Sequence, residues 1–200
     1  MDSSFIRNKL VIFILTIVAL LVILLSCGFI SNMTSTRARA QGGQEAQNTK
    51  ANLVYSRDYD ISIFGLEQFH PFDSKKWGKV ADELVKKGVV LSYQSFHNPQ
   101  MADKDLLTRY LTREYLDSLQ SPAVISRIVE LIPLRYLPLP VSQSRLLTPM
   151  LLQTHGSIMA TRLALENKTA VINIGGGFHH ASKTGGGGFC VYPDITLCVM

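Results

Sequence analysis

Residues 170–200 read AVINIGGGFHHASKTGGGGFCVYPDITLCVM, and this stretch is the key to both fold and function. A short β-branched strand, 170–174, is followed at once by three glycines, two adjacent histidines and, after four more residues, four more glycines. Glycine is used where the backbone must approach another group closely or adopt positive φ. We therefore expect His179 and His180 to lie in a tight pocket wall at the carboxyl end of a strand.

The two neighbouring imidazoles favour proton transfer. Histidine exchanges protons near neutral pH, so one ring can act as base or acid while the other is its electrostatic partner. Binding of one metal ion by both rings is disfavoured, because adjacent residues seldom direct both side chains to a single ion. Adjacent histidines in a loop are often plain surface residues, and here it is the flanking glycines that favour a functional pocket.

A phosphate-binding loop is the main alternative for this stretch. Residues 177–184, GFHHASKT, nearly match G-x-x-x-x-G-K-[ST] and follow a strand. Ser182 replaces the second glycine, however, and glycines follow where the motif needs the amino terminus of a helix. A dinucleotide fingerprint also fails, since His180 stands where its last glycine would be. Nucleotide binding that depends on Lys183 would revive this alternative.

Upstream of this stretch, helical patterns alternate with short apolar strands. Apolar residues spaced by three and four, and proline after a capping residue, predict helices. The expected helices are 74–87, one capped by Asp103, 112–119, one starting at Ser121 and Pro122, 148–166 and a last one from Pro193; the expected strands are 53–55, 89–91 and a buried 170–174; and 133–140, with three prolines, is expected to be an extended loop.

This alternation predicts an α/β domain over residues 53–200, with a mainly parallel sheet flanked by helices. Ligands of such sheets bind at the carboxyl ends of the strands, which is where 175–189 would lie. The net charge is only +5 and no block of five like charges occurs, so we expect no direct nucleic-acid binding. The three cysteines form neither a disulfide framework nor a metal knuckle, which favours a reducing compartment.

The amino terminus has the composition of a membrane segment. Residues 10–30 carry no charge, and as a helix they would be about 31 Å long, roughly the thickness of the bilayer's hydrocarbon core. We therefore expect a membrane anchor or signal segment over 1–31 and a flexible polar linker over 32–52. Basic residues flank the run on both sides, so the orientation is left open.

Three versions of this segment stay open. An uncleaved anchor fits the length of the run, a cleaved signal peptide could use Ala38-Arg39-Ala40, and Leu24 to Gly28 resembles a bacterial lipoprotein site with Cys27 at the mature start. The first and third attach the chain to a membrane through residues 10–30. We expect a membrane-attached protein, single-pass or lipid-anchored, with the side of the membrane unassigned.

Several motifs of 53–200 occur together in the order of a known family. They are Val54-Tyr55-Ser56, Gly65-Leu66-Glu67, His70-Pro71-Phe72-Asp73, Lys76-Trp77-Gly78-Lys79-Val80, Thr112-Arg113-Glu114-Tyr115-Leu116, Gln153-Thr154 with 156–160, 173–180, and Gly187-Gly188-Phe189-Cys190 through Asp194. The segment resembles the amino-terminal half of a zinc-dependent histone deacetylase, which has the arginase/deacetylase type of parallel sheet. The HPFD…KWGKV run makes it most similar to class IV, the deacetylase 11 group.

The resemblance implies a reaction and roles for four residues. The family hydrolyses the amide of an N-ε-acyl-lysine side chain with a zinc-bound water. His180 would be the general base and acid, and His179 its electrostatic partner. Gly188 and Phe189 would form one wall of the channel that takes the acyl-lysine of a protein or peptide substrate.

The resemblance also implies that parts of the site are missing from these 200 residues. The family's zinc ligands (an Asp and a His in a D-x-D-x-H segment, and a later Asp) and its oxyanion tyrosine all lie beyond the tandem histidines, so no metal ligand is assigned here. Leu111 and His155 stand where the family usually has His and Gly, and we expect His155 to be a surface or half-buried imidazole without a role. We expect a truncated deacetylase-like domain, with an unpaired sheet edge at 171–174 and no turnover on its own. The alternative is a non-catalytic, membrane-anchored fragment that binds a partner.

Overall fold

The computed structural model describes residues 51–101 and 105–200. The expected membrane segment at 10–30, almost all of the linker and the capping residue Asp103 lie outside these ranges. Within them, no helix is both long enough and apolar enough to cross a bilayer. The described residues all belong to one compact unit of the chain, which begins near Ala46.

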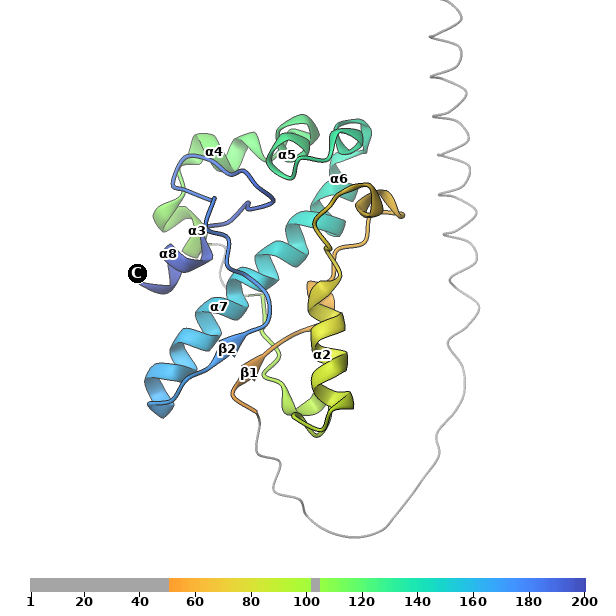
Figure 1. The fold of residues 1–200 in the computed structure, drawn as a ribbon. Helices are drawn as coiled ribbons and strands as arrows, with labels where there is room; N and C mark the ends of the chain where they lie inside the picture. Colours follow the sequence, from red (N-terminus) through yellow and green to blue (C-terminus); the bar gives the residue numbers. More distant parts are fainter. Residues whose placement is uncertain (1–50, 102–104) are drawn as a thin grey trace, which may run out of the picture. The chain divides into compact units, whose positions relative to one another are not determined.

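A small parallel sheet pairs a strand near the start of the described chain with a strand from its last third (Figure 1). Strand β1, Leu53–Val54, pairs in parallel with β2, Ile172–Asn173, with Leu53 opposite Ile172. On the other side of β1, Val54 forms a parallel bridge with His97. The His97 N–H donates to the Leu53 carbonyl at 2.9 Å. β1 is therefore flanked on both sides, whereas β2 pairs on one side only among the described residues.

Helix α7, Thr148–Asn167, packs against both strands of this sheet (Figure 1). The sequence Thr148-Pro149 predicts that Thr148 caps the helix, and this is wrong, because the helix continues from a π-helical turn, η5, Gln143–Leu147. The Thr148 hydroxyl donates to the Gln143 carbonyl at 3.0 Å instead of capping. The carboxyl end is at Asn167, followed by Lys168 in a left-handed conformation (φ 51°).

The expected helices form where local patterns were strong. Thr112 caps α4 by accepting the Tyr115 N–H, and Pro122 opens α5 at the first helical position, where its missing N–H has no intrahelical partner in any case. Besides α7 and η5, the described helical elements are η1 Arg57–Tyr59, η2 Leu66–Phe69, α2 Lys76–Lys86, η3 Tyr93–Ser95, α3 Asp105–Tyr110, α4 Arg113–Ser118, α5 Pro122–Ile128, η4 Ile132–Tyr136, α6 Leu139–Ser142 and α8 Asp194–Cys198.

Three expectations about the secondary structure are wrong. Residues 89–91 are not a strand: the N–H groups of Val89 and Val90 donate back to the Leu84 carbonyl and close the end of α2. Residues 133–140 form η4 and the start of α6 rather than an extended loop, since their prolines occupy first turns. The strand within 170–174 is not buried, because Ile172 is 61% exposed.

The core lies between α7, the sheet and the shorter helices. Its fully buried side chains come from segments far apart in sequence: Tyr59, Ile61, Ile63, Ile125, Ile128, Leu134, Leu146, Met150, Val54, Val129 and Val191. The observed architecture is a helix-rich α/β domain with a parallel sheet of two short strands, and it places the segment after β2 beside α7, α8 and the helices α4 and α5.

Candidate functional site

The glycine loop, residues 175–188, is held in place by a buried carboxylate. Asp194, at the start of α8, is 1% exposed, and it accepts the N–H groups of Gly177 and Phe178, both at 2.8 Å. Its Oδ2 also accepts the hydroxyl of Ser157 on α7 at 2.6 Å. Buried carboxylates need such donors, because an unpartnered charge in the interior is costly. Asp194 therefore ties the loop to two helices.

Two amide side chains and a phenol also hold the glycine loop in place. Gln153, fully buried on α7, accepts the Gly176 N–H at 3.2 Å and donates to the Tyr59 carbonyl at 2.8 Å. The Asn173 amide donates to the Gln153 carbonyl at 2.9 Å, and its oxygen accepts the Tyr59 hydroxyl at 2.8 Å. Burial raises the pKa of Tyr59 far above its ordinary value, so this phenol stays a hydrogen-bond donor.

Close approach explains two of the glycines directly. Gly176 has φ +79°, and a Cβ added there would lie 2.4 Å from both Asp194 Oδ2 and Ser157 Oγ. Gly156 on α7 faces the Tyr59 hydroxyl, which would be 1.9 Å from an added Cβ. The sequence argument that glycines mark a tight backbone therefore holds at these positions.

The two histidines lie side by side on this loop. The ring centroids of His179 and His180 are 4.1 Å apart, with an angle of 42° between the rings. His179 is anchored locally, since its Nδ1 lies 3.1 Å from the Gly177 carbonyl and its own N–H donates to the same oxygen. Both residues are exposed. The loop thus presents an imidazole pair to solvent from a fixed backbone.

Gly188 and Phe189 lie next to that pair. Gly188 has φ +51°, and a Cβ there would lie 2.6 Å from Cδ2 of His180, so the ring packs against bare backbone. Phe189 also has positive φ (63°), which is uncommon for a residue other than glycine. Its N–H donates to the Ile128 carbonyl at 3.0 Å, which fixes it to the end of α5.

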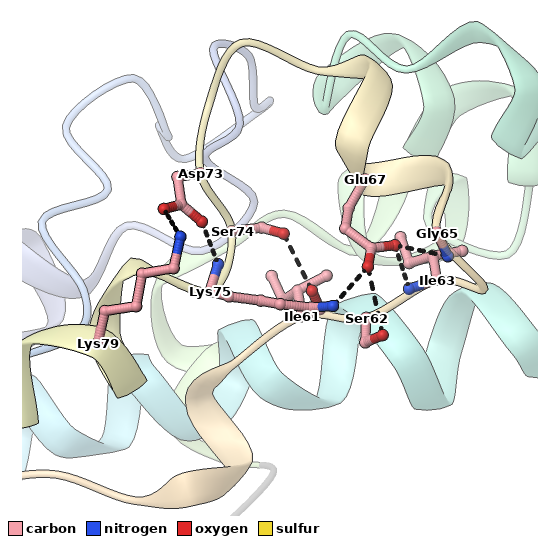
Figure 2. Close-up of polar contacts among 9 residues, drawn as sticks. All are labelled: Ile61, Ser62, Ile63, Gly65, Glu67, Asp73, Ser74, Lys75 and Lys79. Atoms are coloured by element: carbon pink, nitrogen blue, oxygen red, sulfur yellow. Dashed lines mark hydrogen bonds and ion pairs between the residues drawn. The ribbon is translucent and has the colours of Figure 1, made fainter. Parts of the chain in front are cut away.

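The Phe189 ring is covered by a segment to which the sequence argument gave no role. Residues 61–75, which we call the Glu67 loop, place Phe72 in a stack on Phe189 with centroids 4.5 Å apart, and His70 at 5.3 Å (Figure 2 shows the loop's polar contacts). Phe189 is consequently only 5% exposed. The HPFD motif could have drawn attention to this loop, but nothing local in the sequence pairs it with residue 189.

The sequence of this chain is similar to known proteins of one family. The histone deacetylase domain family matches residues 70–200. The chain belongs to the histone deacetylase family. It is 45% identical over 152 residues to histone deacetylase 2 of Arabidopsis thaliana, and 26% identical over 161 residues to histone deacetylase 1 of Homo sapiens and of Bos taurus.

These alignments cover most of this deacetylase-family chain but a minor part of its relatives. The match takes in 76% of the chain and 38% of the Arabidopsis protein, and 78% of the chain and 33% of the human protein. The chain therefore spans about a third of the length of the curated relatives it matches. Activity and substrates of those whole proteins do not pass to this chain without further argument.

The deacetylase family is generally zinc-dependent, and zinc needs several His, Cys, Asp or Glu ligands that converge on one point. In 51–101 and 105–200, no three His, Cys, Asp or Glu residues come together in a way that could hold a metal ion. Asp194 is already fully engaged by N–H and hydroxyl donors. The described residues of the deacetylase domain thus do not fit a zinc site.

Three surface cavities of the deacetylase unit have linings that do not include the histidines. One of about 620 Å³ is lined by the glycines 175–177, Asp194, Ile195 and Cys198. Two others, of about 630 and 520 Å³, lie near Arg57 and Arg145 and near Arg127 and Arg135. None of these three cavities is lined by His179 or His180, and both residues are exposed, so the pocket wall expected for the imidazole pair is not seen in these cavities.

His155 is more deeply buried than the surface or half-buried position expected for it. It is 4% exposed on α7, with Nδ1 2.9 Å from the Leu151 carbonyl and Nε2 without a hydrogen-bond partner. Burial lowers its pKa, which favours the neutral ring. The deacetylase fold therefore uses this imidazole as part of its interior.

Proposed function

We propose that this chain supplies the proton-transfer groups and one channel wall of an acyl-lysine amide hydrolase. The observation that carries the proposal is the imidazole pair, 4.1 Å apart, on a glycine loop fixed by Asp194, in a member of the histone deacetylase family. His180 acts as general base and acid, His179 as its electrostatic partner, and Gly188 with Phe189 as the wall beside the acyl-lysine stem.

The proposed chemistry requires a proton to move twice. A base takes a proton from the attacking water, and an acid then returns a proton to the leaving lysine amine. An imidazole can do both near neutral pH, and His180 is exposed beside the wall formed by Gly188. Zinc, which the family uses to polarise the acyl carbonyl, would have to be bound by residues other than the described ones.

A chimeric enzyme tests these roles. Residues 53–200 would replace the matching segment of the Arabidopsis histone deacetylase 2, and release of acetate from an acetyl-lysine peptide would be measured. We expect turnover in the chimera and a loss of roughly 10²–10⁴-fold with His180→Ala, as for removal of a general base. The loss with His179→Ala should be smaller.

Lys183→Ala is the matched control, because Lys183 is an exposed side chain on the same loop. Turnover of the chimera should not change with it. An active chimera that keeps its rate with His180→Ala would contradict the proposed role of the histidine. Nucleotide binding by the chain that disappears with Lys183→Ala would instead support the phosphate-loop alternative.

For the 200-residue chain alone we propose no deacylase turnover. Turnover on an acyl-lysine peptide that is lost both with His180→Ala and with a chelator would contradict this. The alternative function, a non-catalytic fragment that binds a partner, is favoured by the edge of β2, with which no other described strand pairs. Transcript sequence beyond Met200 discriminates between the two: a D-x-D-x-H segment soon after it would support the hydrolase.

Two finer assignments are also proposals. The His70–Asp73 and Lys76–Val80 motifs support class IV, and a comparison in which they group with another deacetylase class would overturn it.

Residues 10–30 support membrane attachment. The chain should stay with the membrane fraction in alkaline carbonate, and a variant lacking residues 1–31 should be released; recovery of both in the soluble fraction would refute attachment.

A further inference from the structure

The Glu67 loop is folded around one buried carboxylate (Figure 2). Glu67 is 8% exposed, and its Oε2 accepts the backbone N–H of Ile63 at 2.8 Å and that of Gly65 at 3.1 Å. Its Oε1 accepts the Ser62 hydroxyl at 3.3 Å and forms an ion pair with Lys75 at 2.8 Å. One side chain therefore gathers donors from both ends of the loop.

The loop needs this support because its backbone is unusual. Phe64 (φ 53°) and Gly65 (φ 88°) are both left-handed, a conformation that is unfavourable for a residue other than glycine. The turn directs the N–H groups on either side of Phe64 inward, where the carboxylate binds them. Ser74 and Ile61 close the base of the loop with two hydrogen bonds, at 2.9 and 3.0 Å.

The far end of the same loop carries the rings that cover Phe189. The Phe72 N–H donates to Nδ1 of His70 at 3.0 Å, which fixes that imidazole and leaves the proton of its neutral form on Nε2. The Lys76 ammonium lies 4.1 Å from the Phe72 ring centroid, and Trp77 packs at 5.9 Å. Phe72 is thus held between the start of α2 and the channel wall.

A contact path leads from this loop to the imidazole pair. Phe72 stacks on Phe189, whose positive φ follows directly on that of Gly188. Gly188 lies so close to His180 that no side chain fits between them. Because each contact is tight, movement of Phe72 would move the Phe189 backbone and with it the surface on which His180 rests.

We propose that Glu67 is a positioning residue of the candidate site, whose carboxylate holds His70 and Phe72 on Phe189 and thereby sets the place of His180. The inference rests on the proposed function for what the site does. It adds that the wall is built from two segments more than a hundred residues apart, and that Glu67 fixes the nearer one.

The test uses the full 200-residue chain in detergent and two spectroscopic readouts. Trp77 is the single tryptophan of the chain, so its fluorescence reports on the packing of Phe72. The imidazole signals of the five histidines in NMR spectra report on His70 and His180, after assignment by single replacements. Circular dichroism in the far ultraviolet verifies that the helices remain.

With Glu67→Gln we expect more acrylamide quenching of Trp77 and shifted signals of both His70 and His180, with the helical signal retained. Lys75→Met removes only the ion pair and should give smaller changes in the same direction. Glu83→Gln is the matched control, since Glu83 is an exposed carboxylate that also pairs with lysines, and it should change neither readout.

Unchanged Trp77 quenching, or an unmoved His180 signal, in a folded Glu67→Gln chain would overturn the proposal. If that variant does not fold, hydrogen exchange of the unaltered chain decides: the amides of residues 63 and 65 must exchange more slowly than that of Ser62, and equal rates would overturn the role. These readouts need no turnover. Inactivity of the chimera would therefore refute the proposed function and leave the positioning role standing.

Discussion

The glycine loop and the outer edge of β2 follow each other in the chain, yet one is fully supported and the other is bare. The loop has Asp194, Gln153 and Asn173 beneath it, each with its polar groups engaged. The edge has Ile172 at 61% exposed, and Ile195 and Val199, which line the cavity beside glycines 175–177, are 55% and 81% exposed. Local polar support can thus be complete where the apolar sheet around it is not.

The reason is that the two regions are stabilised in different ways. A hydrogen-bonded loop needs only a few correctly placed donors and acceptors, which α7 and α8 already provide. A strand edge needs another strand or a covering layer, and unpaired edges are sites of association. The described part of the chain therefore presents a hydrogen-bonded loop beside a strand edge that no other described strand covers.

Removal of the central carboxylate should have the largest effect. Asp194→Ala leaves the Gly177 and Phe178 N–H groups buried without an acceptor, so we expect a loss of roughly 3 kcal/mol or more of unfolding free energy. Urea unfolding followed by circular dichroism measures it. Asp117→Ala, at an exposed position on α4, is the control and should change stability by less than about 0.5 kcal/mol. A similar small loss for Asp194→Ala would remove the contrast between loop and edge.

Two neighbouring glycines separate close approach from backbone strain. Gly176 and Gly177 have nearly equal φ, 79° and 78°, but an added Cβ meets Asp194 and Ser157 at Gly176 and open space at Gly177. Gly177→Ala should cost about 1–2 kcal/mol from φ alone. Gly176→Ala should cost clearly more, since Asp194 must also move. Equal losses in thermal unfolding would mean that the carboxylate does not define this backbone.

The charge of Glu67 makes the stability of the Glu67 loop depend on pH. Burial raises the pKa of Glu67, but the hydrogen bonds from Lys75 and the Ile63 N–H outweigh it and leave the pKa below its ordinary value. Its stabilising contribution is therefore complete above the unfolded-state pKa of about 4.3 and is lost as pH falls through the lower folded-state pKa. The stability difference between the chain and Glu67→Gln should shrink as pH is lowered from 6 to about 3, and a difference that stays constant would contradict this.

The sheet edge should respond least in stability and most in association. Ile172→Lys should change unfolding free energy by no more than about 0.5 kcal/mol, because the side chain is already exposed. A lysine on an open edge opposes pairing with another chain, so light scattering should show less self-association than with Ile172→Val. A large loss of stability would show that the edge is packed after all, and the comparison would fail.

Features that depend on residues close together in sequence could be predicted, and features that depend on other contacts could not. The helices α2 and α5 and most of α7 follow from apolar spacing, proline and capping residues within one or two turns. Residues 89–91 and 133–140 were misassigned, because strand-like composition and proline content are weak against the closing of a neighbouring helix. The strands proved only two residues long, and periodicity has nothing to measure at that length.

The candidate site divides along the same line. The glycines and the tandem histidines are adjacent in sequence, so the chain by itself determined that two imidazoles lie together on a tight backbone. Only the tertiary structure decided that Asp194, Gln153 and Tyr59 support that backbone and that the Glu67 loop covers Phe189. Those contacts join segments from 16 to more than 100 residues apart, and no local pattern encodes which distant donor meets which acceptor, because only packing of the whole unit brings them within reach.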